Sequence, residues 1–283
     1  MRWRLPAPAL VAFGVTGCLL WLALGPWGCV VERDFGDLAP EGDVEAQVAP
    51  YGQPLRVVQA WPEDGAQGVA RNVRIVIDFD QYLDPAVSDG GAIRVRSGGV
   101  AVPVRTHYRL SRRRLVGELR QELLAELRYE VSLNPATVLA LDGSPLAAPW
   151  TLRFSAGDEV APQEGVTRTT SWPEVAARFD LGCGCHQVEP RPAQWFDIPR
   201  LDRSALVGAP SAQVPGRALV DPYRPTTSYV LHKVLADYPD RVGTVMPPPW
   251  ASEVAKTRAL PAQPLSVAEA EAVELWILAG ATP

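Results

Sequence analysis

Hydrophobic and polar residues alternate with a period of two over a long central part of the chain. In residues 73–79 every second position is apolar, which is the pattern of a strand with one buried face. Shorter apolar runs follow at residues 93–95, 100–104, 115–119, 129–133 and 152–154. Turn signals with glycine separate many of them, at residues 89–91, 98–99 and 142–145. About seven short strands at this spacing predict an all-β sandwich over residues 55–156.

Beyond residue 170 the hydrophobic period becomes that of a helix. One stripe is formed by Trp172, Val175, Ala176 and Phe179. Ser171 and Glu174 have the spacing of a capping box, which satisfies free amide groups at the start of a helix. A second such pair, Ser266 and Glu269, precedes the last apolar stretch. The sequence therefore predicts a mainly α-helical domain over residues 171–283, framed by two packed terminal helices.

The first 29 residues have the pattern of an export signal. Arg2 and Arg4 precede an uncharged, mostly apolar stretch over residues 7–27. This segment resembles a bacterial lipoprotein signal, in which a cysteine after a small residue is lipidated and becomes the first residue of the mature protein. Cys29 is the expected lipidation site and Cys18 the alternative; an uncleaved membrane anchor helix is the other interpretation. All of these place the rest of the chain on the exported side of a membrane, in the periplasm or at the cell surface.

Two further segments are predicted to connect domains. Residues 30–54 carry six acidic residues against Arg33 alone, together with three prolines, which is typical of an extended tether. Residues 157–170 have no apolar periodicity and form the predicted interdomain linker. The exported part keeps only Cys183 and Cys185, so it has no long-range disulfide framework.

Composition and charge narrow the function classes. The chain has 283 residues, 47% of them hydrophobic and 21% charged, as in a globular protein long enough for two domains. Lys and Arg number 27 against 32 Asp and Glu, so the net charge is 27 − 32 = −5. Because there is also no long basic run, we expect no nucleic acid partner.

Residues 55–156 resemble bacterial Ig-like domains of the S-layer type. The resemblance rests on residues 61–69, 75–79, 127–131, 142–146 and 150–154. It implies a spacer or adhesive module. His107 has no metal-binding neighbour at ligand spacing, and Asp78, Asp80 and Asp84 lack the loop spacing of a calcium site. We therefore expect no ligand site within this domain.

The sharpest chemical signal is Cys183-Gly184-Cys185-His186. In c-type cytochromes Cys-x-x-Cys-His binds haem, because two thiols bond the vinyl groups and the histidine binds iron. Here Cys183 stands two residues before Cys185 instead of three, which turns its side chain by about 100° on a helix. Met246 heads a Met-Pro-Pro-Pro segment 246 − 186 = 60 residues past His186. A thioether on a proline turn is typical of the second axial ligand.

Residues 172–283 resemble the cytochrome c-like modules of bacterial envelope proteins, through residues 220–230 and 264–281 in addition to the cysteine motif. The resemblance implies covalent haem c attached through Cys185, with or without a second thioether to Cys183. His186 and Met246 would be the axial iron ligands. Such an iron has no open position for substrate, so the implied activity is electron transfer with unknown redox partner proteins rather than catalysis.

Two other interpretations of the cysteine cluster remain open. In one, the module binds no haem, Cys183 and Cys185 are thiols or form a tight disulfide, and the protein is a structural or adhesive envelope lipoprotein. In the other, Cys183, Cys185, His186 and Met246 bind Cu(I), which prefers thiolate, imidazole and thioether ligands. His232 is the spare ligand, expected to be a surface histidine or one that supports a ligand.

Overall fold

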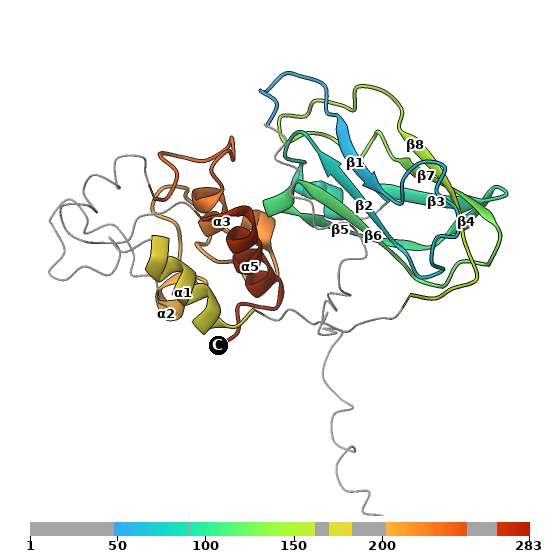
Figure 1. The fold of residues 1–283 in the computed structure, drawn as a ribbon. Helices are drawn as coiled ribbons and strands as arrows, with labels where there is room; N and C mark the ends of the chain where they lie inside the picture. Colours follow the sequence, from blue (N-terminus) through green and yellow to red (C-terminus); the bar gives the residue numbers. More distant parts are fainter. Residues whose placement is uncertain (1–47, 90, 162–169, 183–201, 248–264) are drawn as a thin grey trace, which may run out of the picture. The chain divides into compact units, whose positions relative to one another are not determined.

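The computed structural model describes residues 48–89, 91–161, 170–182, 202–247 and 265–283. Within these residues, eight strands form two antiparallel four-stranded sheets (Figure 1). The first sheet has the order β1 (Val57–Trp61), β2 (Arg74–Phe79), β6 (Arg114–Leu119) and β5 (Val104–Arg109). The second has the order β4 (Val100–Val102), β3 (Ile93–Ser97), β7 (Arg128–Leu133) and β8 (Thr151–Ser155). The predicted β-sandwich is confirmed.

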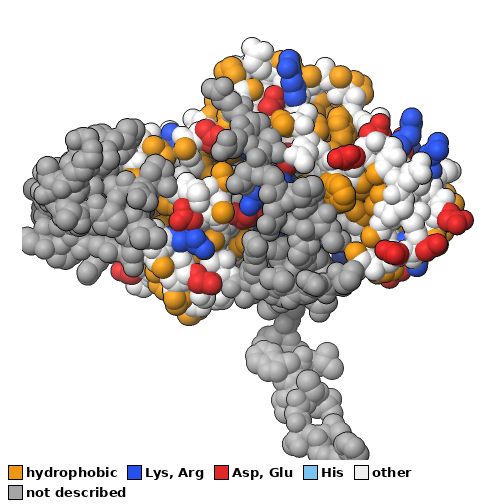
Figure 2. Space-filling view, viewed as in Figure 1, with side chains coloured by type: hydrophobic (Ala, Val, Ile, Leu, Met, Phe, Trp, Pro, Cys, Tyr) orange, Lys and Arg blue, Asp and Glu red, His pale blue; other side chains and the backbone are white. Residues whose placement is uncertain are grey.

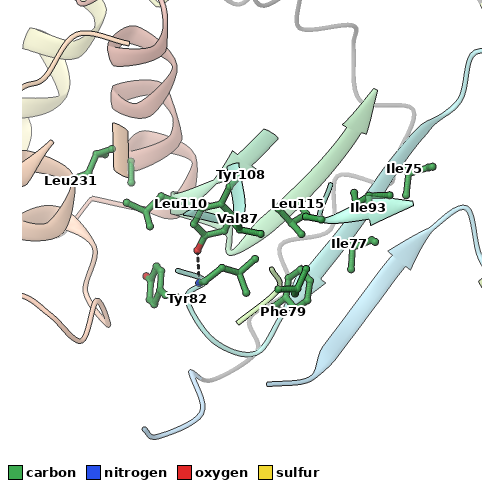
Figure 3. Close-up of a cluster of buried hydrophobic side chains, with 14 of the residues drawn as sticks. Ile75, Ile77, Phe79, Tyr82, Val87, Ile93, Tyr108, Leu110, Leu115 and Leu231 are labelled. Carbon is green, nitrogen blue, oxygen red and sulfur yellow. Dashed lines mark hydrogen bonds between the residues drawn. The ribbon is translucent and has the colours of Figure 1, made fainter. Parts of the chain in front are cut away.

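Alternating apolar side chains form the interior between the two sheets. Ile75, Ile77 and Phe79 of β2 are each at most 1% exposed, and Tyr129 of β7 stacks on Phe154 of β8 with ring centroids 5.6 Å apart. Figure 3 shows Ile75, Ile77, Phe79 and Leu115 together in this cluster. Successive side chains of a strand point to opposite faces, so Ile75, Ile77 and Phe79 share the inner face of β2. Val76 and Asp78 on the other face are buried as well, so the expectation of a single buried face was wrong for β2.

One apolar run of the sequence divides into two strands that belong to different sheets. Within the run at residues 100–104, β4 ends at Val102 and β5 begins at Val104, with Pro103 between the two strands. Proline has no amide hydrogen for the ladder, so the chain leaves the second sheet there and continues in the first. β5 then extends five residues beyond the predicted run, to Arg109.

The sandwich forms hydrogen bonds on both sides of residues 55–156. The Gly52 amide donates to Asp142 Oδ2 at 2.7 Å. On the other side, the side-chain amide of Asn72 donates to the Ala161 carbonyl oxygen and accepts from the Ala161 amide, each at 2.9 Å. The described residues 48–54 and 157–161 are thus bound to the sandwich.

The described helical residues begin with α1 (Trp172–Gly182) and end with α5 (Val267–Leu278). Between them lie α2 (Arg203–Leu206), the 3-10 turn η5 (Pro225–Thr227) and α3 (Tyr229–Val234). The capping box of Ser266 and Glu269 is confirmed, with both of its hydrogen bonds present. The predicted contact between the first and last helices is also confirmed, because the rings of Trp172 and Trp276 lie 5.2 Å apart and α1 packs on α5.

None of the helices in the described ranges is long and apolar enough to cross a membrane. The predicted export signal, with Cys18 and Cys29, lies outside those ranges. On the face drawn in Figure 2, basic and acidic side chains of the described residues are interspersed with hydrophobic ones.

Candidate functional site

Of the four residues predicted to bind haem or copper, the structure describes Met246. Cys183, Cys185 and His186 lie outside the described residues. The Met246 amide donates to the carbonyl oxygen of Lys233, in α3, at 2.7 Å. Its side chain is partly buried, and the following Pro247 is buried. The main chain at Met246, the predicted axial ligand, is therefore hydrogen-bonded to helix α3.

The segment between α3 and Met246 is held to that helix by polar contacts. Lys233 is 8% exposed, and its ammonium group donates to the carbonyl oxygens of Thr244 at 2.6 Å and Val242 at 3.2 Å. The Tyr229 hydroxyl also donates to the Val242 oxygen, at 2.9 Å. Burial, with the nearby charge of Arg241, lowers the pKa of Lys233. These contacts satisfy the carbonyl groups of a segment that has no regular secondary structure.

His232 is buried, so the first of the two expectations for it, a surface histidine, was wrong, whereas a role in supporting a ligand stays a prediction. His232 is 0% exposed, and all the other residues of the short helix α3 are buried as well. Arg217 can only donate, so His232 Nδ1 accepts from Arg217 Nη1 at 2.9 Å and Nε2 donates to the Thr226 oxygen at 2.9 Å. Burial lowers the pKa of His232 to about 4. With both ring nitrogens hydrogen-bonded, His232 is not placed to bind a metal in this arrangement.

The polar residues of the sandwich considered in the sequence have structural contacts. Asp78 forms a bidentate pair with Arg114, at 2.6 and 3.0 Å, and both side chains are buried. His107 Nε2 lies 3.3 Å from Glu118 Oε2 across β5 and β6. Burial alone would raise the pKa of Glu118, but the hydrogen bond and charge of His107, with nearby arginines, lower it. Within the described ranges, no group of three or more His, Cys, Asp or Glu is arranged to hold a metal ion.

The other carboxylates of the suggested calcium group also accept main-chain hydrogen bonds. Asp80 accepts from the Arg56 amide at 2.9 Å, and Asp84 accepts from the Ala86 amide at 2.8 Å at the start of the 3-10 turn η1 (Pro85–Asp89). These contacts fix the strand exit and the turn that follow β2. They give the acidic positions a local structural role.

Sequence reasoning missed a buried carboxylate that joins the sandwich to helix α5. Glu274 is 0% exposed and accepts hydrogen bonds from the amides of Leu110, at 2.7 Å, and Ser111, at 3.0 Å, and from the Ser111 hydroxyl. Both donors belong to the 3-10 turn η2 (Leu110–Arg112), which connects β5 and β6. Burial raises the pKa of Glu274, although nearby Arg109 and these hydrogen bonds favour its charged form.

Three further polar contacts join the sandwich to the helical residues. Arg112 of η2 pairs with Glu271 of α5 at 2.7 Å, and both side chains are largely buried. Asp237, between α3 and Met246, accepts from the Tyr82 hydroxyl at 2.5 Å and from Arg113 at 2.8 Å. No periodicity or motif indicates these pairs, because the partners are more than 120 residues apart along the chain.

Comparisons with known proteins bear on the sandwich. Residues 52–156 match the family described as a bacterial Ig-like domain, which confirms the Ig-like part of the sequence interpretation. Sandwiches of this kind are common in cell-surface proteins, in agreement with an extracellular or envelope location. The match ends at residue 156 and does not extend to the cytochrome c-like prediction. No curated protein sequence matches the chain.

Several solved structures are similar to part of the chain. The N-terminal part of the bacterial S-layer protein SbsC has 13% identity and a TM-score of 0.30, covering 38% of this chain and 24% of that one. CopC from Methylosinus trichosporium OB3b has 19% identity and a TM-score of 0.31, covering 38% and 99%. PcoC, a methionine-rich copper resistance protein from Escherichia coli, has 16% identity and a TM-score of 0.30, covering 37% and 99%. The chain thus spans about a quarter of the S-layer fragment, and similarity at this level does not extend to function.

Proposed function

We propose that this protein is an exported, lipid-anchored protein of the bacterial envelope in which the Ig-like sandwich is a structural support for the C-terminal helices. The observation that carries this proposal is the burial of Glu274 of α5 against three donors of η2. A buried carboxylate is costly unless its partners stay in place, so this contact favours a fixed support over a freely jointed spacer. The match of residues 52–156 to bacterial Ig-like domains supports the envelope location.

Cell fractionation with matched cysteine variants tests the anchored location. We expect the full-length protein in the membrane fraction, with a diacylated cysteine as its amino terminus by mass spectrometry. Cys29→Ser should remove the diacylated amino terminus, whereas Cys18→Ser should leave it in place. The opposite result would assign the anchor to Cys18. An unmodified amino terminus at Met1 in a membrane-bound protein would contradict lipidation.

A second function, electron transfer by a covalently bound haem, is favoured by the placement of α1. This helix packs on α5 through Trp172 and Trp276 and ends at Gly182, directly before Cys183. The order of cysteine motif, histidine and distant methionine is that of c-type cytochromes. Met246, whose amide donates to the Lys233 carbonyl oxygen and whose side chain is partly buried, would suit an iron ligand. Among the described residues, Met246 therefore fits the role of a haem ligand.

Each residue of the proposed haem site has a separate role. Cys185 would attach the porphyrin through a thioether, with Cys183 as a second attachment, and His186 and Met246 would bind the iron. A haem with two protein axial ligands supplies outer-sphere electron transfer when bound. The chain would then set the iron potential through the thioether ligand and through solvent access.

Production with a competent c-type maturation system separates this function from its rivals. Haem that stays on the denatured chain supports the electron carrier, and Cys185→Ser should abolish it. Cys183→Ser should retain a single thioether. Its reduced α-band should lie at longer wavelength than that of a haem with two thioethers, because one vinyl group stays conjugated with the ring. A chain that takes up no haem but binds Cu(I) supports the copper site, with loss of binding in Met246→Ala. A chain that binds neither leaves the structural function alone.

A further inference from the structure

The segment that carries Met246, residues 235–247, is held by the sandwich as well as by α3; we call it the Met246 loop. The Tyr82 hydroxyl donates to Asp237 at 2.5 Å, and Arg113 pairs with the other oxygen of the same carboxylate at 2.8 Å. The Tyr51 hydroxyl donates to Asp240 at 2.6 Å. In these three contacts the sandwich supplies the donors and the loop supplies the carboxylates.

Aromatic rings connect the same three parts of the molecule. Tyr82 of the sandwich contacts Tyr238 of the loop edge to face, with ring centroids 5.0 Å apart. Tyr238 stacks on His232 of α3 at 4.2 Å with an interplanar angle of 19°. All three rings are at most 3% exposed. The ring series Tyr82, Tyr238 and His232 therefore links the sandwich through the loop to the helix whose Lys233 oxygen binds the Met246 amide.

The contacts differ in strength because they differ in exposure. Tyr82 is 2% exposed, and its hydrogen bond ends on a carboxylate that also pairs with Arg113. Charge-assisted hydrogen bonds of this kind are stronger than hydrogen bonds between two neutral groups. Tyr51 is 47% exposed, so its bond to Asp240 competes with water and contributes less. Tyr82 and Asp237 are therefore the principal connection.

We propose that the Ig-like sandwich is a positioning element for Met246, acting through Tyr82, Arg113 and Asp237 on the Met246 loop. Restraint of the loop restrains the main chain at Met246, since the loop is bound on one side by the sandwich and on the other by Lys233. The consequence for iron rests on the proposed haem function, whereas the restraint itself does not require haem. The sandwich then does more than separate a module from the membrane.

Hydrogen exchange in the full-length protein without haem tests the restraint. We expect Tyr82→Phe to accelerate exchange of the Met246 amide by about tenfold, because the loop opens more often when its hydroxyl contact is lost. Tyr51→Phe should have a smaller effect. Tyr129→Phe is the matched control, because it removes a tyrosine hydroxyl that bonds within the sandwich, to Leu124. It should leave Met246 unchanged.

A second variant protects the test against a general loss of folding. Asp237 is 45% exposed, so Asp237→Asn weakens both sandwich contacts without emptying buried space. It should accelerate Met246 exchange as Tyr82→Phe does, with an unchanged circular dichroism spectrum. Equal Met246 exchange in wild type, Tyr82→Phe and Asp237→Asn would overturn the proposal.

In the haem-loaded protein the same variants are compared by absorption spectrum and reduction potential. A purely structural role of Tyr82 would change neither of them. Tyr82→Phe should weaken the ferric absorption band that reports sulfur ligation and lower the reduction potential, while Tyr129→Phe leaves both unchanged. Accelerated Met246 exchange with an unchanged band and potential would support the restraint and contradict Met246 as the iron ligand. A chain that takes up no haem would contradict the haem function, while Met246 exchange in the haem-free protein would still test the restraint.

Discussion

The interior of the sandwich and its junction with α5 are both shielded from water, but different interactions hold them. Between the sheets, Ile75, Ile77 and Phe79 contact other apolar side chains and have no polar group to satisfy. At the junction, Glu274 is bound by directional hydrogen bonds from η2, beside the pair of Arg112 and Glu271. Apolar packing tolerates rearrangement, whereas a buried carboxylate requires each donor in its place.

This difference predicts different responses to substitution. In the sandwich, stability lost on truncation should follow the apolar volume removed. At the junction it should follow the number of hydrogen-bonding groups left without a partner, because an unsatisfied buried group carries its full desolvation cost. The junction also contains apolar contacts, as Figure 3 shows Leu110 of η2 and Leu231 of α3 in one buried cluster. Those contacts should respond as the sandwich does.

The largest effect is expected at Glu274. Glu274→Ala leaves two amides and one hydroxyl of η2 buried without their acceptor and opens a cavity, so we expect a loss of about 4 kcal/mol in the free energy of unfolding. Glu274→Gln keeps one acceptor oxygen and should lose about half as much. Urea titration measures both. Glu271→Gln is the comparison, because the pair of Glu271 with Arg112 is less buried. If Glu274→Gln lost less stability than Glu271→Gln, the importance of the Glu274 carboxylate would be contradicted.

The apolar half of the comparison is tested at Ile77 of β2, which is 0% exposed. Ile77→Ala should reduce the free energy of unfolding by about 3 kcal/mol and Ile77→Val by about 1 kcal/mol. Exchange of the Leu110 and Ser111 amides in Ile77→Val should remain close to wild type. Selective exposure of those two amides in Ile77→Val, but not in Glu274→Gln, would remove the distinction between the two regions.

The sequence allows the sandwich to be predicted well and the junction hardly at all. Ile75 and Ile77 show their buried face through local periodicity, which needs no knowledge of the rest of the chain. Glu274 lies in the predicted final helix, but its partners are 163 and 164 residues away, and a buried glutamate looks like a surface one in sequence. The burial of His232 could not be predicted for the same reason, because packing around a short helix decides it. Only long-range contacts carry this information.

The candidate site also has a part that local sequence patterns predict and a part that only long-range contacts determine. The Cys-Gly-Cys-His motif and the Met-Pro-Pro-Pro segment are local patterns, so sequence reasoning could select Met246 as a ligand. The contacts that fix its loop come from Tyr82 and Arg113 of the sandwich, and no local pattern indicates them. The haem, copper and haemless interpretations of Cys183, Cys185 and His186 stay predictions.

A buried histidine gives the helical region a pH dependence. The pKa of His232 is about 4 in the folded protein, against an ordinary value of 6.5, so between these values the unfolded chain binds more protons. Stability should therefore fall as the pH falls through this window, by about 2 kcal/mol from about pH 7.5 to about pH 5. His232→Gln should remove this part of the slope. An equal slope in both proteins, measured by urea titration, would contradict the assigned burial.

The smallest expected effects compare two helix starts that look alike in sequence but differ in structure. At α5, the Ser266 hydroxyl accepts from the Glu269 amide, and the Glu269 carboxylate accepts from the Ser266 amide. At α1, the Glu174 carboxylate accepts from the Ser171 amide at 2.8 Å, but the Glu174 amide is bound by the Ser171 carbonyl oxygen instead of its hydroxyl. Ser266→Ala should therefore cost about 1 kcal/mol in thermal or urea unfolding, and Ser171→Ala only a few tenths. Equal losses would show that the hydroxyl caps both helices in solution.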